Sequence, residues 1–297
     1  MSDFEHLIPA MAEKSRSMSD QERKAWLDTP RWLTYTRAKE IDAKLEWLYG
    51  HPRVTRMPNM LLIGRTNNGK TDLITRFASR HPPCDNPSGE HINVPVLIVQ
   101  TPPKPTEAGF YMELVRPMLK RLPNGSADTK RAFVVGLLKD IQLKVLVIDE
   151  MHNMLSGTAQ SQHLFLNVIK YLTNDLQISI IGVGDQTLIN AISVDEQLQN
   201  RFEPEILPRW DRGKEFSRLL SSFELILPLR HPSHLVDPLL SMKILSICEG
   251  TIGELSKLLN AATRYAIDSG IEQINDVVLT KCAYRPPSER KKAILEV

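Results

Sequence analysis

Residues 64–71 read GRTNNGKT and carry side chains whose types and spacing suggest a chemistry. They match the pattern G-x-x-x-x-G-K-T, in which the glycines let backbone N–H groups turn onto phosphate oxygens. The lysine would reach the β- and γ-phosphates of a nucleotide, and the threonine hydroxyl would bind Mg²⁺. The pattern predicts a phosphate-binding loop made of Gly64, Arg65, Thr66, Asn67, Asn68, Gly69, Lys70 and Thr71.

A second pair of candidate groups, Asp149 and Glu150, follows the apolar run VLVI. An apolar strand that ends in Asp is typical of the metal-binding half of such a site, so Asp149 would hold Mg²⁺ directly or through water. The adjacent Glu150 suits a general base that orients the attacking water. Together with the loop, this pair predicts hydrolysis of a nucleoside triphosphate with Mg²⁺ as a cofactor.

Other nucleotide-using classes make different demands on the sequence. A GTPase would need an N/T-K-x-D motif, and the TK pairs at Thr129 and Thr280 lack the Asp, which favours ATP. The stretch LSGTAQSQ at 155–162 looks like the signature of a transporter ATPase, but that signature lies upstream of the acidic pair. We therefore expect a loop that opens a helix. A nucleotide kinase would act as a monomer and transfer phosphate to a bound acceptor, so it would have little use for Glu150 as a base that activates water.

Arg201, in the stretch DEQLQNRF, follows the fourth apolar run by about the length of one helix. An arginine there could project into the site of a neighbouring subunit and stabilise transition-state charge. It could equally be a surface arginine in an ion pair of little energetic consequence. The residues alone leave both interpretations open.

The elements that must position these groups alternate between Met57 and Trp210. Short runs rich in Val and Ile, separated by longer helical patterns, are NMLLIG, NVPVLIVQT, KVLVIDE and ISIIGVG, with FEPEILPRW as a fifth candidate. Continuous apolar runs indicate strands buried on both faces. The sequence thus predicts an α/β fold with a five-stranded parallel sheet between helices.

Helical patterns flank this region on both sides. Before it, we expect a helix from Thr29, with Pro30 at its first position, to Gly50. Its apolar stripe would be Ala38, Ile41, Leu45 and Leu48. After it, four helical stretches follow, and one of them presents a single apolar face made of Leu255, Leu258, Leu259, Ala262 and Ala266.

Composition sets wider bounds. Of the 297 residues, 42% are apolar and 24% are charged, which indicates a folded globular protein. A net charge of +2 gives no argument for or against nucleic acid, and three scattered cysteines indicate neither a disulfide framework nor a zinc site. No apolar run approaches the ~18 residues of a membrane span, and the N-terminus lacks a signal-peptide core. We therefore expect a cytoplasmic protein with no membrane partner.

At this point the motifs resemble a known class. LLIGRTNNGKT, VLVIDEMHNM, IIGVGD and QNRFEP, followed by helices, resemble an AAA+ ATPase. RMPNMLLIGRTNNGKTDLITRF, VQTPPKPTEAGFY and LPRWDRGKEFSRLLSSFELILPL are similar to the TniB/TnsC family of transposition ATPases, from about Trp32 to Ile274. The resemblance implies ATP and Mg²⁺ as cofactors, and it implies Arg201 as an inter-subunit finger beside Lys70, Thr71, Asp149 and Glu150.

The resemblance also implies a function and partners. Such proteins assemble on double-stranded DNA as homo-oligomeric rings or helical filaments and select the insertion target. They recruit or activate a transposase and contact a targeting subunit of the TniQ type, and ATP hydrolysis drives disassembly. Alternatives are a helicase-loader or clamp-loader-type ATPase and a STAND-like signalling ATPase, which would need a long effector or repeat domain.

By the same resemblance, the region between the second and third strands can face a central pore. Between Thr101 and Val147 there are eight Lys or Arg against four Asp or Glu, a local balance of +4. We expect phosphate contacts from Lys104, Lys130 and Arg131.

The predicted domain organisation completes this reading. It comprises an N-terminal helical segment 1–50, an AAA+ nucleotide-binding subdomain 51–212, a helical lid 213–285 and a basic tail 286–297.

Asp185 stands where the family has a polar sensor, but a carboxylate there would be repelled by a γ-phosphate. Glu254 stands near the second sensor position, so neither sensor is assigned.

Overall fold

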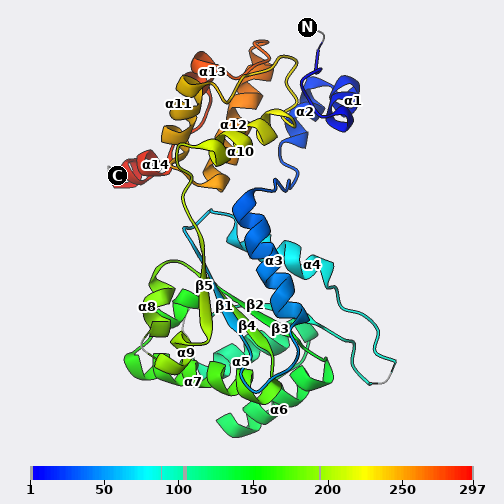
Figure 1. Cartoon of the computed structure of the whole chain (residues 1–297), viewed down its shortest axis with the longest axis vertical. Coiled ribbons are helices and arrows are strands. Elements are labelled where there is room, and N and C mark those ends of the chain that lie inside the picture. Colours follow the sequence, from blue (N-terminus) through cyan, green and yellow to red (C-terminus); the bar gives the residue numbers. More distant parts are fainter. Residues whose placement is uncertain (1–2, 88, 103–105, 194, 296–297) are drawn as a thin grey trace. The chain divides into compact units, whose positions relative to one another are not determined.

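The computed structural model describes residues 3–87, 89–102, 106–193 and 195–295, and the chain divides into two compact units (Figure 1). One unit is Met1–Thr36 with Arg209–Val297, and the other is Arg37–Pro208. These divisions follow residues 36 and 208, whereas the corresponding boundaries expected from the sequence were 50 and 212. The expected N-terminal segment 1–50 is therefore shared between the two units.

A five-stranded parallel sheet forms the centre of the unit Arg37–Pro208, in the order β2-β3-β4-β1-β5. The strands are β1 Asn59–Gly64, β2 Val96–Gln100, β3 Val145–Asp149, β4 Ser179–Gly184 and β5 Phe202–Leu207. Every residue of β1 and β4 is buried, as expected for continuous apolar runs inside a parallel sheet. The predicted α/β fold class is confirmed.

Strand β5 lies at one edge of the sheet, beside β1. It contains Pro204, which has no N–H to donate and is tolerated on an edge strand. Only its two ends, Phe202 and Leu207, are buried. The edge position explains why this strand is the least apolar of the five candidates in the sequence.

Helices cover both faces of the sheet (Figure 1). They are α3 Thr36–Gly50, α4 Lys70–Arg80, α5 Glu107–Val115, α6 Ala127–Asp140, α7 Ala159–Leu176, α8 Thr187–Ser193 and α9 Glu196–Gln199, with 3-10 turns η1 Arg116–Met118 and η2 Met151–Ser156. Helices α5 to α9 share one apolar core with alternate residues of the strands. The predicted stripe of α3, Ala38, Ile41, Leu45 and Leu48, is buried.

The predicted start of this helix at Thr29 is wrong, because α3 begins at Thr36. The Thr29 hydroxyl instead donates to the carbonyl of Trp26, at the end of α2. The non-helical segment that follows uses its aromatic side chains for packing: the Tyr35 ring meets Trp210 edge-on, with 4.9 Å between centroids. This contact with a residue far along the chain overrides the local capping signal.

The second unit is helical. It contains α1 Pro9–Ser17, α2 Asp20–Trp26, α10 Lys214–Glu224, α11 Pro238–Cys248, α12 Ile252–Asp268, α13 Asp276–Lys281 and α14 Pro287–Leu295. Helix α12 buries the apolar face expected from the sequence, and Gly270, at a φ of +71°, follows its end. The expected basic tail contains helix α14. Among the described residues, no helix is both long and apolar enough to cross a membrane.

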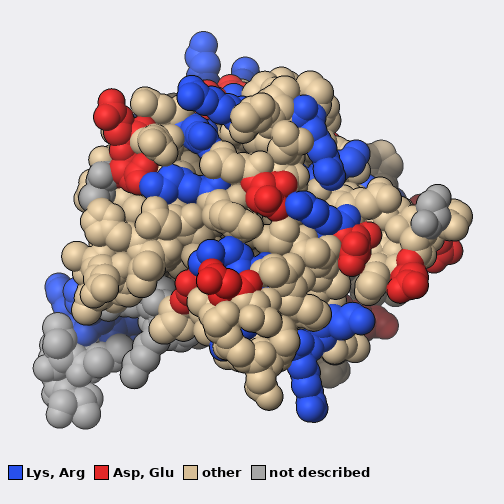
Figure 2. Space-filling view, turned by 90° about the horizontal axis from the view of Figure 1, so that it is seen from below, with Lys and Arg blue, Asp and Glu red and all other residues tan. Residues whose placement is uncertain are grey.

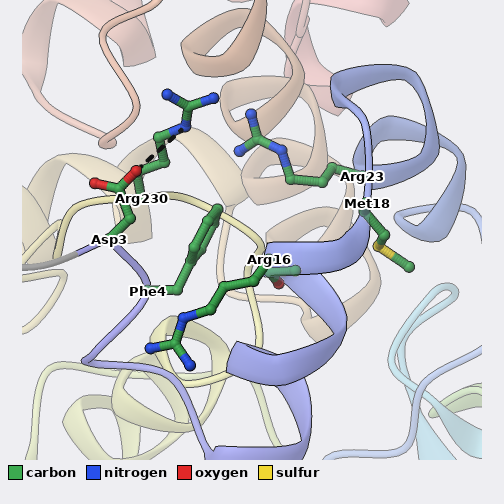
Figure 3. A pocket seen from close by; sticks show the side chains of 7 residues that line it. Asp3, Phe4, Arg16, Met18, Arg23 and Arg230 are labelled. Carbon is green, nitrogen blue, oxygen red and sulfur yellow. Dashed lines mark ion pairs between the residues drawn. The ribbon is translucent and has the colours of Figure 1, made fainter.

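Helix α2 is tied to the rest of this unit by a buried arginine. Arg23 is 1% exposed, and its two terminal nitrogens donate to the carboxylate of Glu272 at 2.8 and 2.7 Å. These hydrogen bonds raise the pKa of Arg23. Figure 3 shows Arg23 and Arg230 beside Phe4. These residues line a hollow of about 390 Å³.

Glu272→Ala is expected to destabilise the protein by about 3 kcal/mol, at the lower end of the range for a broken buried pair, because Arg23 keeps only Asp20 at 2.6 Å as a carboxylate partner. Denaturant unfolding of the full chain measures the loss. Asp268→Ala is the matched control, since Asp268 pairs with Lys24 at 2.5 Å in an exposed setting. That variant should cost less than about 1 kcal/mol. Equal losses in the two variants would contradict the assigned role of the buried pair.

Candidate active site

The eight residues predicted to bind phosphate run from the last residue of β1, through the loop 65–69, into the first turn of α4. Asn67 and Gly69 adopt left-handed backbone conformations, with φ of +61° and +80°. Lys70 is the first residue of α4, so the N–H groups of the first helical turn and the positive end of the helix dipole face the loop. A side chain at Gly64 would place its Cβ 3.1 Å from Cβ of Leu207, which is tighter than ordinary contact. The loop therefore has the curvature of a phosphate cradle.

Lys70 points back into this loop. Its ammonium donates to the carbonyl oxygens of Gly64 at 2.8 Å and Arg65 at 2.9 Å, and the residue is 8% exposed. Burial lowers the pKa of Lys70, while the nearby carboxylates, first of all Glu150, act in the opposite direction. The cation is thus held by neutral carbonyl groups, which an incoming phosphate could replace with a stronger, charged partner.

Asn68 anchors the loop to the neighbouring strand. Its amide nitrogen donates to the carbonyl oxygens of Leu207 and Pro208, both at 3.0 Å, and the residue is buried. The pattern G-x-x-x-x-G-K-T leaves this position unspecified, so sequence reasoning assigned Asn68 only a general place in the loop. The contacts show that it joins the loop to the end of β5.

The acidic pair meets the loop although β4 separates β3 from β1. The hydroxyl of Thr71 donates to one carboxylate oxygen of Asp149 at 3.1 Å, and the other oxygen accepts from the N–H of Glu150 at 2.8 Å. Asp149 ends β3, and the carboxyl ends of parallel strands share one edge of the sheet. A hydroxyl oxygen and a carboxylate oxygen side by side fit the preference of Mg²⁺ for oxygen ligands.

The end of β4 makes room for the segment that follows the acidic pair. A Cβ on Gly182 would lie 2.5 Å from the sulfur of Met151, and one on Gly184 would lie 3.2 Å from Nδ1 of His152. The imidazole Nε2 of His152 lies 3.3 Å from a carboxylate oxygen of Glu150. Sequence reasoning did not single out His152 as a functional residue; the only signals for it were the DEMHN and GVG stretches.

The carboxylate of Asp185, the residue expected at the sensor position, is hydrogen-bonded to the first residue of α8. Its carboxylate accepts from the N–H of Thr187 at 2.9 Å and from the Thr187 hydroxyl at 2.5 Å. Burial alone would raise the pKa of Asp185, but these hydrogen bonds and the nearby His152 and Lys70 hold it below its ordinary value. The carboxylate therefore stays ionised and caps the start of α8.

Glu254, near the second sensor position, is also engaged within its own unit. It is buried and accepts from the Tyr284 hydroxyl at 2.8 Å and the Lys257 ammonium at 3.1 Å, and it contacts Arg290. Burial and the hydrogen bond to Glu254 raise the pKa of Tyr284. This network accounts for the acid at this position.

Arg201 lies at the opposite end of the sheet from the phosphate loop. Its carbonyl accepts from the N–H of Asn59, and β5 begins at the next residue, where Phe202 is paired with Asn59. The loop begins at Gly64, five strand residues further on, which is roughly 17 Å away. The guanidinium of Arg201 donates to the side-chain oxygen of Asn174 at 2.8 Å, and no ion pair links it to another described residue.

The candidates for DNA contact have different surroundings. In α6, Arg131 pairs with Glu107 at 2.6 Å and Asp128 at 3.1 Å, and its hydrogen bonds to Glu107 and to the Tyr111 hydroxyl raise its pKa. Lys130 beside it is half-buried, and Lys104 lies outside the described residues. Figure 2 shows basic and acidic side chains interspersed over the face it draws. A phosphate-contacting surface must therefore be argued from individual side chains.

The chain is similar to known proteins in family and in fold. A family model described as TniB, Bacterial TniB protein, matches residues 23–212. No curated protein sequence matches the chain. Solved structures of 14–16% identity share the fold of this chain, a parallel sheet between helices with further helices.

Three solved structures illustrate this likeness. The Aeropyrum pernix ORC1 protein in complex with DNA aligns with a TM-score of 0.58 and 16% identity, over 90% of this chain and 69% of that chain. The ORC2 protein of the same organism, in ADPNP–ADP complexes, aligns with a TM-score of 0.57 and 16% identity, over 86% and 69%. Drosophila ORC bound to DNA gives a TM-score of 0.60 and 14% identity, over 90% and 65%.

Proposed function

The chain belongs to the TniB family, and from this premise we propose that it is an ATP-dependent regulator of DNA transposition. It is an ATP hydrolase with the AAA+ fold. In the proposed cycle, ATP binding drives assembly on double-stranded DNA, and the assembly selects the target site. It then recruits or activates the transposase in contact with a TniQ-type targeting subunit. Hydrolysis of ATP drives disassembly.

The proposed chemistry assigns one role to each group at the carboxyl edge of the sheet. Lys70 would neutralise the β- and γ-phosphates, and Thr71 with Asp149 would hold Mg²⁺. Glu150 would accept a proton from the attacking water. The 3.1 Å contact between Thr71 and Asp149 supports this assignment, because it brings the two oxygen ligands of the metal together. The bound metal would polarise the phosphate oxygens as the bond to the leaving group breaks.

The position of Arg201 is the observation that carries the oligomeric part of the proposal. Because it lies at the far end of the sheet from the loop of its own chain, it is too distant to complete that site, which supports a role in the site of a neighbour. Its described partner, Asn174, is neutral, so its positive charge remains available. Contacts of this head-to-tail kind generate rings or helical filaments.

The DNA contacts in the proposal come from the segment between β2 and β3. Lys104, Lys130 and Arg131 remain candidates, although Arg131 would have to share its charge with two carboxylates. Lys120 and Arg121, after η1, are exposed and add two cations to the same segment. Such side chains would bind the phosphate backbone without reading bases. The DNA seen in the ORC1 and Drosophila ORC structures supports this choice of partner.

We expect ordered rings or filaments when the protein is mixed with a non-hydrolysable ATP analogue and duplex DNA, because the bound γ-phosphate would hold the site closed against Arg201 of a neighbour. Negative-stain electron microscopy, with and without DNA, measures this. Absence of any DNA-dependent assembly would contradict the transposition proposal.

The control for this experiment removes charge without touching the nucleotide site. The variant Lys120→Ala/Arg121→Ala/Lys130→Ala should bind the ATP analogue normally and lose the DNA-dependent assembly. If this variant still assembles on DNA, the DNA must be bound by other residues. Loading of a helicase or sliding clamp in place of transposase recruitment would favour the loader-type alternative.

A further inference from the structure

His152 lies beside the predicted base of the candidate active site. Its Nε2 atom is 3.3 Å from a carboxylate oxygen of Glu150. The side chain of His152 is 26% exposed, so the imidazole is enclosed on most of its surface.

The surroundings of His152 fix its position. It belongs to η2, and this turn is anchored by Met151 and Met154, both 0% exposed. Gly184 leaves the space that the ring and backbone of His152 occupy: a Cβ there would lie 3.2 Å from Nδ1 and 3.4 Å from the backbone nitrogen. The imidazole is therefore placed by packing against β4 and has little freedom to turn away.

The buried ring nitrogen indicates which tautomer is present. Nδ1 of His152 is inaccessible and has no hydrogen-bond partner among the described residues. A buried N–H without a partner is rarer and more costly than an acceptor that is left unpaired. The neutral ring therefore carries its proton on Nε2, the atom that faces Glu150.

Glu150 needs such a partner. Its backbone is held in a left-handed conformation, with φ of +51°, and its N–H donates to Asp149. Among the described residues, His152 is the one that forms an ion-pair contact with the carboxylate of Glu150. A general base acts efficiently only when its carboxylate is held within hydrogen-bond reach of the water that it activates.

We propose that His152 is a positioning residue, whose Nε2–H orients the carboxylate of Glu150 toward the attacking water. The inference rests on the proposed role of Glu150 as the base. The 3.3 Å separation is an ion-pair contact that is not yet aligned as a hydrogen bond, and catalytic contacts of this kind often tighten only when substrate is bound. His152 itself does not touch the nucleotide in this scheme, so its loss should change turnover and leave nucleotide affinity intact.

The test compares two variants of His152 by steady-state ATP hydrolysis on duplex DNA. His152→Leu keeps the volume and removes the donor, and it should lower kcat roughly 10- to 100-fold with KM for ATP unchanged. His152→Gln places an amide N–H near the position of Nε2 and should remain within about 3-fold of the wild type. His163→Leu, at an exposed histidine of α7, is the matched control and should behave as the wild type.

A combination with Glu150→Gln separates positioning from general damage. If His152 acts through Glu150, then His152→Leu should lower the residual rate of the Glu150→Gln variant no further. A further loss, a raised KM, or equal damage from His152→Gln would overturn the inference. If His152→Leu hydrolyses ATP at the wild-type rate while Glu150→Gln is inactive, the inference is overturned but the proposed function stands. If Glu150→Gln is fully active, Glu150 is not the base, and both that assignment and the inference fail.

Discussion

Glu150→Gln is expected to lower the rate of ATP hydrolysis about 100- to 1,000-fold while ATP binding is preserved. The amide has the shape of the carboxylate but cannot accept a proton from water. Lys70, Thr71 and Asp149 keep their contacts, so the nucleotide would still be held. The variant should therefore accumulate in the ATP-bound assembly on DNA. Hydrolysis measurements together with electron microscopy after a chase with competitor DNA report both effects.

Lys70→Ala is the opposing variant, and it should fail at an earlier step. The ammonium lies inside the loop, bonded to the carbonyls of Gly64 and Arg65, where it would meet the β- and γ-phosphates. Without it, nucleotide binding and assembly should both be lost. The two variants should thus be equally inactive in hydrolysis and opposite in assembly. Identical behaviour in the assembly assay would contradict the role of Glu150 as the base.

The phosphate loop and the acidic pair could be located from sequence because their geometry is local. A strand, a glycine-bearing loop and a helix follow one another directly around Lys70, so the pattern alone specifies the shape. Asp149 could be placed beside this loop because parallel strands bring their carboxyl ends to one edge. The structure adds the 3.1 Å contact between Thr71 and Asp149, which is the consequence of that topology.

What the sequence could not reveal depends on partners far along the chain. Arg131 was an attractive cation in a basic segment, but Glu107, 24 residues earlier, pairs with it. The role of Asn68 depends on its hydrogen bond to the carbonyl of Leu207, at the end of β5. The false helix start at Thr29 arose because Tyr35 packs on Trp210. In each case the deciding contact joins segments whose proximity no local pattern encodes.

Arg201→Ala is expected to lower ATP hydrolysis by about 1,000-fold or more, in the range found when an arginine finger is removed. Nucleotide binding should be unaffected, because the residue lies roughly 17 Å along the sheet from the loop of its own chain. Asn174→Ala is the matched control: it removes the described hydrogen-bond partner of Arg201 and keeps the guanidinium. It should retain most of the activity if Arg201 works on a neighbour.

A mixing experiment decides whether Arg201 acts between chains. Arg201→Ala subunits keep a complete loop and base, whereas Glu150→Gln subunits keep the finger. Where an Arg201→Ala site faces a Glu150→Gln neighbour, every required group is present. An equimolar mixture should therefore recover roughly a quarter of the wild-type rate per chain, since half of the chains have the base and half of those have the right neighbour. Two inactive proteins that regain activity on mixing can do so only if the site is shared. Absence of recovery, with mixed assemblies visible by microscopy, would place the effect of Arg201 within its own chain, where its contact with Asn174 gives it a purely structural role.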